Sequence, residues 1–133
     1  MTIQLDHAIV PSHNQVASAK LLAVLLGVPW AAKSDVGPFS PVYVNDGFAL
    51  DFIDTEEDFP VYHFCFRVEQ AEFDAILARL KAAGIPYGST PDGVIDMQIG
   101  TPYGNIYWYE PDGHYWEMLT VSYARLPGAE QSQ

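Results

Sequence analysis

Three residues that could bind a metal ion occur in short apolar segments that lie far apart in the sequence. His7 lies in segment 5–10, His63 in segment 61–66 and Glu117 in segment 115–119, and each segment is typical of a β-strand. Because side chains alternate between strand faces, each polar residue shares its face with apolar neighbours, and a carboxylate in such a place requires a cation or hydrogen-bond donors. Two imidazoles and one carboxylate suit Fe(II), Mn(II), Zn(II) or Ni(II), with coordination positions left open.

The elements that must position these residues occur twice. Residues 5–30 resemble residues 61–87, because each stretch has a strand with a histidine, a helical segment and then a Gly-x-Pro stop. The histidines are 56 positions apart, and Gly27 and Gly84 are 57 positions apart. This agreement predicts a duplicated module.

Each module is expected to have the order β-α-β-β-β. Apolar residues at helical spacing predict helices at about 16–26 and between Glu69 and Gly84. The remaining predicted strands cover 42–44, 48–53, 94–99, 105–109 and 115–121. We therefore predict an α+β fold in a single domain, with a first βαβββ module at 1–58, a second at 59–124 and a flexible tail at 125–133.

The repeat also suggests a fourth candidate ligand, Asp51. It lies in the last strand of the first module, as Glu117 does in the second, but the offset is 66 rather than 57. The alignment therefore requires about nine extra residues in the second module, which the stretch from Ser89 to Gly104 could hold. The site would then contain two pairs, His7 with Asp51 and His63 with Glu117. The alternative is that Asp51 is a solvent-facing carboxylate or supports a ligand from outside the metal's coordination sphere.

Composition excludes several classes of function. A chain of 133 residues that is 49% hydrophobic can form one domain with a substantial core. Its formal charge of −11 argues against binding to nucleic acid, to an anionic membrane or to a highly anionic substrate. The single cysteine, Cys65, excludes an intramolecular disulfide, and the sequence shows no signal peptide or membrane span, so we expect a cytoplasmic protein.

The segments 5–10, 63–68 and 105–117, the last containing Pro-Asp-Gly-His-x-x-Glu, resemble the vicinal oxygen chelate superfamily. This group includes glyoxalase I, extradiol dioxygenases, fosfomycin-modifying enzymes and bleomycin-binding proteins. The resemblance implies paired βαβββ modules forming a curled mixed-sheet cleft, with metal ligands from three strands. His7, His63 and Glu117 match those positions, and Asp51 matches the fourth ligand of glyoxalase-like members. The resemblance also implies a homodimer.

Individual residues favour some branches of this superfamily over others. Fosfomycin enzymes resembling this chain carry a hydroxyl residue where it has Ile9, and glyoxalase I has a glutamate where it has Asp51. Extradiol cleavage requires a two-histidine, one-carboxylate site, which is present, with Tyr107 as a candidate proton donor. Cys65 is expected to be a small buried residue and His114 a surface or turn residue.

Two hypotheses about function follow. The first is a divalent-metal-dependent enzyme of the glyoxalase or dioxygenase type, acting on a small substrate with neighbouring oxygens. Under this hypothesis the metal ligands are His7, His63 and Glu117, with Asp51 as a candidate fourth. The residues that take part in catalysis are Glu117, Asp51 and Tyr107. The second is a non-catalytic protein that binds and sequesters a small molecule, as bleomycin-binding relatives do. Loss of metal in a His63→Ala variant would favour the first.

Overall fold

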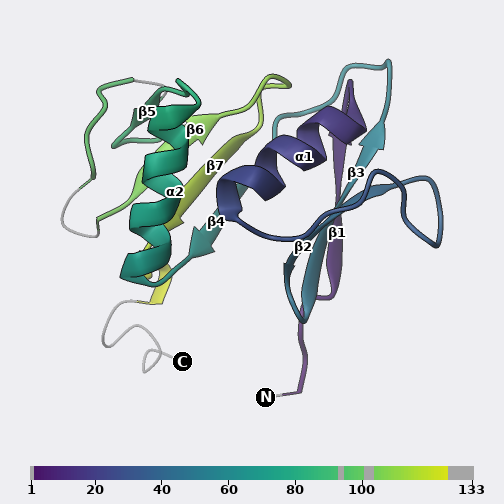
Figure 1. The fold of residues 1–133 in the computed structure, drawn as a ribbon, viewed down its shortest axis with the longest axis horizontal. Coiled ribbons are helices and arrows are strands. Elements are labelled where there is room, and N and C mark those ends of the chain that lie inside the picture. Colours follow the sequence, from purple (N-terminus) through teal and green to yellow (C-terminus); the bar gives the residue numbers. More distant parts are fainter. Residues whose placement is uncertain (1, 93–94, 101–103, 126–133) are drawn as a thin grey trace. The chain divides into compact units, whose positions relative to one another are not determined.

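A strand that begins with a histidine opens each half of the chain. The computed structural model describes residues 2–92, 95–100 and 104–125, and the chain divides into two units, Met1–Tyr62 and His63–Gln133. Each unit combines one mixed sheet with one long helix (Figure 1). The predicted α+β class with two related modules is confirmed.

The first unit contains β1 (His7–Ser12), α1 (Gln15–Leu26), β2 (Ser40–Asn45) and β3 (Phe48–Asp54). Its sheet has the order β1-β3-β2, with β3 parallel to β1 and antiparallel to β2. Helix α1 packs against β2 and β3.

The second unit repeats this arrangement with one more strand. Its elements are β4 (His63–Arg67), α2 (Gln70–Ala82), β5 (Tyr87–Gly88), β6 (Ile106–Tyr109), β7 (Tyr115–Leu119) and a 3₁₀ helix, η1 (Tyr123–Arg125). The sheet has the order β4-β7-β6-β5, with β7 parallel to β4 and antiparallel to β6. Helix α2 lies across this sheet in Figure 1 and buries Phe73, Ile76 and Leu80.

Local sequence signals explain where the helices begin and end. The side chain of Asn14 caps α1 by accepting a hydrogen bond from the Ala17 backbone, and Gly27 ends the helix in the left-handed conformation, with φ of 74°. Glu69 and Glu72 form a capping box at the start of α2, and Gly84 follows its end with φ of 67°. Both helices agree with the prediction to within one or two residues.

Strand pairing confirms the alignment of the two modules. Ile9 lies opposite Asp51 in the first unit, as Cys65 lies opposite Glu117 in the second. Trp30 forms an isolated bridge with Val42, twelve positions on, whereas Tyr87 pairs with Trp108, twenty-one positions on. The nine extra residues of the second unit therefore lie between β5 and β6, where the sequence places them.

The predicted strand at 94–99 is wrong. Residues 95–99 form no strand, and residue 94 lies outside the described residues. Met97 has φ of 56°, which a regular strand does not allow, and Asp96 accepts hydrogen bonds from the Ser89 and Gln98 backbones. The strand that pairs with β6 is instead β5, at 87–88. Residues 126–133 of the predicted tail lie outside the described residues.

In the part of the chain that the structure describes, no helix combines the length and the apolar character needed to cross a bilayer.

Candidate functional site

One face of the second unit's sheet carries three of the predicted site residues. The register between β4 and β7 places Cys65 beside Glu117 and His63 beside Tyr115. On the other side of β7, Tyr107 of β6 lies opposite Glu117. Because directly paired residues point to the same face of a sheet, and every second residue of a strand does so, His63, Glu117 and Tyr107 share one face.

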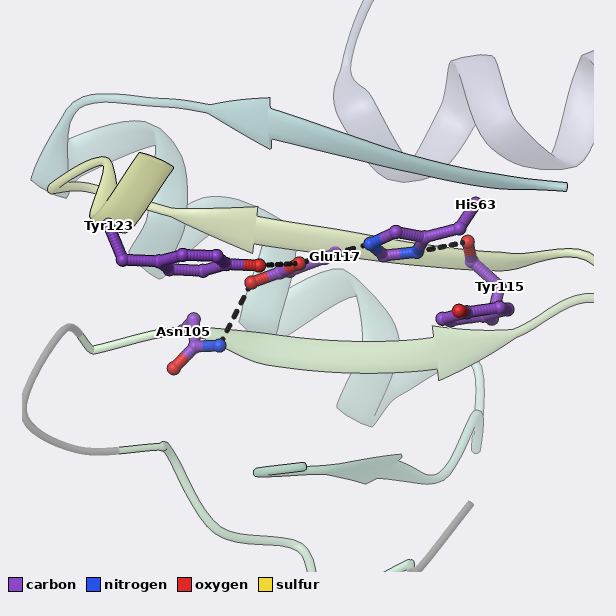
Figure 2. Close-up of polar contacts among 5 residues, drawn as sticks. All are labelled: His63, Asn105, Tyr115, Glu117 and Tyr123. Atoms are coloured by element: carbon purple, nitrogen blue, oxygen red, sulfur yellow. Dashed lines mark hydrogen bonds and ion pairs between the residues drawn. The ribbon is translucent and has the colours of Figure 1, made fainter. Parts of the chain in front are cut away.

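The Glu117 side chain is fully buried, with 0% of its surface exposed. Asn105 Nδ2 donates a hydrogen bond to Oε2 at 2.9 Å, and the Tyr123 hydroxyl donates to Oε1 at 2.9 Å. Figure 2 shows these donors reaching the carboxylate from the start of β6 and from η1. The two hydrogen bonds fix the orientation of the carboxylate and offset part of the cost of burying its charge.

The ring of His63 is held by a contact that determines its tautomer. Its Nδ1 lies 3.0 Å from the Tyr115 carbonyl oxygen, and because a carbonyl only accepts, Nδ1 must carry a proton. Nε2 then faces Glu117 Oε1 at 3.1 Å (Figure 2). A neutral His63 directs a lone pair from Nε2 towards the carboxylate, and that arrangement calls for a proton or a metal ion between the two atoms.

Aromatic packing further restrains His63. Its ring stacks on Tyr115, with 4.2 Å between ring centroids, and lies 5.9 Å from the ring of Tyr107. Only 30% of the His63 side chain is exposed. The two tyrosine rings therefore restrain the imidazole while Nε2 faces Glu117.

The first unit carries the corresponding pair, His7 and Asp51. His7 Nδ1 lies 2.7 Å from Asp6 Oδ2, and this hydrogen bond raises the pKa of His7, with smaller electrostatic contributions from Asp6 and Asp51. Donation from Nδ1 to Asp6 leaves Nε2 as the free nitrogen, the same one that His63 presents. A pocket of about 390 Å³ in this unit is lined by His7 and Asp51, among other residues.

The two carboxylates occupy equivalent positions in different surroundings. Glu117 is fully buried and receives hydrogen bonds from Asn105 and Tyr123. Asp51 is half-buried, and its carboxylate makes no hydrogen bond to any residue in the described ranges. Hydrogen bonds from the described residues therefore orient the Glu117 carboxylate but not that of Asp51.

Cys65 and Tyr107 lie on either side of Glu117, and both hold their protons firmly. Partial burial of the thiol, followed by the nearby Glu117 charge, raises the pKa of Cys65 to about 12. Burial also raises the pKa of Tyr107, with further contributions from Tyr123 and Glu117. Both groups are protonated at neutral pH, so Tyr107 could serve as a proton donor and not as a base.

Each unit supplies one histidine and one carboxylate to the predicted ligand set. Within neither unit do the described residues gather three His, Cys, Asp or Glu side chains suited to hold a metal ion. The donor chemistry nevertheless fits a divalent ion, because both histidines have Nδ1 engaged and Nε2 available, as metal-bound histidines usually do. The structure unites His63, Glu117 and Tyr107 in one unit and holds His7 and Asp51 in the other.

Two residues of this site were not predicted from the sequence, Asn105 and Tyr123. The only available signal was that a buried Glu117 must have hydrogen-bond donors, which does not identify them. Two further expectations differ from the structure. His114 directly follows the turn at 111–113, as expected, but is fully buried rather than at the surface, and Cys65 is exposed at the wall of a pocket rather than enclosed in the core.

The known proteins that resemble this chain are solved structures. No family model and no curated protein matches the chain. The structure of Oxidase ChaP-H2 is 36% identical, with a TM-score of 0.85 over 92% of this chain and 97% of that one. Oxidase ChaP-H1 is 35% identical, with a TM-score of 0.83 over 93% of this chain and 100% of that one.

More distant structures share the fold. A glyoxalase/dioxygenase from Nostoc punctiforme is 18% identical, with a TM-score of 0.64 over 87% of this chain and 89% of that one. The fosfomycin resistance protein FosX from Mesorhizobium loti is also 18% identical, with a TM-score of 0.61 over 93% and 96%. Given the two oxidases at more than a third identity, the repeated modules and these shared folds, the chain belongs to the vicinal oxygen chelate superfamily.

Proposed function

We propose that the protein is a divalent-metal-dependent oxidase that acts on a small substrate with two neighbouring oxygen atoms. The observation that carries this proposal is the His63–Glu117 pair, in which the imidazole Nε2 is directed at a buried carboxylate oxygen 3.1 Å away. The oxidative branch is favoured over glyoxalase chemistry because two proteins described as oxidases are 35% and 36% identical to this chain.

The proposed ligands are His7, His63 and Glu117, with Asp51 as a candidate fourth. An iron or manganese ion held by such a set would supply Lewis-acid stabilisation to substrate oxygens and redox chemistry with dioxygen. Each unit supplies one histidine and one carboxylate to this set.

The chain's own groups would prepare this site in three ways. The Tyr115 carbonyl and the Asp6 carboxylate keep the Nε2 atoms of His63 and His7 free of protons in the neutral state. Asn105 and Tyr123 hold the Glu117 carboxylate in place. Tyr107, protonated at neutral pH, is available to donate a proton or a hydrogen bond to a substrate oxygen.

Elemental analysis of the metal content per chain tests the proposal. Protein purified without a metal-affinity tag is expected to contain or take up about one divalent ion, and His63→Ala and Glu117→Ala variants are expected to lose it. His13→Ala is the matched control, because His13 contacts the Thr55 carbonyl instead of this network. Retention of stoichiometric metal by both site variants would rule out the proposed ligand set.

A second candidate function is sequestration of a flat small molecule without catalysis, as in bleomycin-type binding. It is favoured by the aromatic character of the same sheet face, where the rings of Tyr109 and Tyr115 stack with 5.6 Å between centroids beside His63. Under this function, His63→Ala would keep most of the protein's affinity for its ligand. Under the first, the variant would lose both metal and turnover.

A further inference from the structure

A pocket of about 300 Å³ lies beside the Glu117 network in the second unit. Its lining consists of Cys65, Arg67, Leu119, Ser122, Tyr123 and Ala124. Cys65 pairs directly with Glu117 across β4 and β7, and Tyr123 donates a hydrogen bond to the same carboxylate. A molecule in this pocket would therefore lie next to the residues that hold Glu117.

Arg67 gives this pocket its positive charge. It is exposed at the end of β4, on the same face as His63 and Cys65, and its side chain makes no hydrogen bond or ion pair with any described residue. The chain has 17 acidic residues against 6 basic ones, so an arginine without a described carboxylate partner is unexpected. A guanidinium in this position is available to bind a carboxylate through two parallel hydrogen bonds.

The extended backbone of β4 sets the distance between Arg67 and the proposed metal ligand His63. Arg67 is four residues beyond His63, which corresponds to about 13 Å along an extended strand. Cys65 lies between the two on this face of β4, Leu119 lies opposite Arg67 on β7, and Tyr123 and Ala124 add aromatic and apolar lining to the same pocket. A ligand that spans this distance needs an apolar or aromatic body with its oxygens at one end and its negative charge at the other.

We propose that Arg67 binds a carboxylate of the substrate, and that the substrate is an aromatic carboxylic acid whose two neighbouring oxygens lie at the opposite end. This assignment rests on the proposed function, because it places the reacting oxygens near His63 and Glu117. One carboxylate is favoured over a phosphate, because a single guanidinium faces the pocket and the net charge of −11 disfavours multivalent anions.

Binding of two matched probes to metal-free protein tests this inference. Isothermal titration in the presence of EDTA would compare 2-naphthoate with its neutral analogue 2-naphthalenemethanol. We expect Arg67→Gln to weaken 2-naphthoate binding about tenfold and to change binding of the alcohol less than about twofold. Arg67→Lys should give an intermediate affinity, because lysine keeps the charge and loses the bidentate geometry.

Lys81→Gln is the matched control, since it removes one positive charge from the exposed surface of α2 and should not alter binding of either probe. Wild-type affinity for 2-naphthoate in Arg67→Gln, or no preference of the wild type for the acid over the alcohol, would overturn the assignment. The assay contains no metal, so its failure is distinguishable from loss of the proposed function. If the protein takes up metal normally but does not prefer 2-naphthoate to 2-naphthalenemethanol, only the Arg67 subsite is rejected and the proposed function stands.

Discussion

At the scale of single residues, the site depends on which donors form hydrogen bonds to the buried Glu117 carboxylate. The repeat in the sequence suggested a pair of His63 with Glu117, and the register of β4 and β7 puts the two side chains on one face. The sequence could not identify Asn105 and Tyr123, because a donor's reach depends on where β6 and η1 place it in space. The burial of His114 was missed for the same reason, since a turn sequence does not reveal the packing around it.

Asn105→Ala should destabilise the protein, because it leaves Glu117 Oε2 without its donor at a fully buried position. We expect a loss of about 1–3 kcal/mol in the free energy of unfolding, measured by urea titration in EDTA. Gln98→Ala is the control, since Gln98 is exposed. Equal stability of Asn105→Ala and the control would show that the hydrogen bond contributes little.

Cys65 should react slowly with iodoacetamide at neutral pH. Its pKa of about 12 lies above the usual value, so the reactive thiolate is scarce at pH 8 and increases as the pH rises towards 12. Glu117→Gln removes a nearby negative charge, which lowers the pKa and should accelerate alkylation at pH 8. Mass spectrometry at several pH values measures both rates. A wild-type rate that levels off near pH 9 would contradict the raised pKa.

At the scale of elements, helices were predicted well and short strands less well. Both helices carry caps and a glycine stop that are local in sequence. The wrong strand at 94–99 had a suitable mixture of apolar and polar residues, but Asp96 bonds locally with Ser89 and Met97 takes a left-handed conformation. Side-chain to backbone hydrogen bonds of this kind compete with strand pairing and leave little trace in an apolar pattern.

Gly84→Ala should lower the free energy of unfolding by about 1 kcal/mol. Gly84 has φ of 67°, and no atom lies within 4 Å of the position that a Cβ would occupy, so the cost comes from the backbone conformation and not from a clash. Gly47→Ala is the control, because its nearest contact is an ordinary 3.6 Å. Thermal or urea unfolding of the two variants measures the difference, and similar stabilities would contradict this explanation.

At the scale of the whole molecule, the repeat was the strongest signal in the sequence. The positions of the two histidines and two glycines were enough to align the modules, and strand pairing confirms that Asp51 and Glu117 are equivalent. Net charge was less informative about the site. A total of −11 argues against highly anionic ligands, yet Arg67 gives one pocket a local positive charge that no composition reveals.

The order of strands in the two sheets has a consequence for synthesis on the ribosome. In each unit the first strand pairs with the last one made, β1 with β3 and β4 with β7. His63 therefore cannot form its hydrogen bond with Glu117 until a further 54 residues have been synthesised. At about 5–20 residues per second, this delay is about 3–11 s, during which β4 lacks its partner strand. A nascent chain that stalls before residue 115 leaves the second unit without its half of the site.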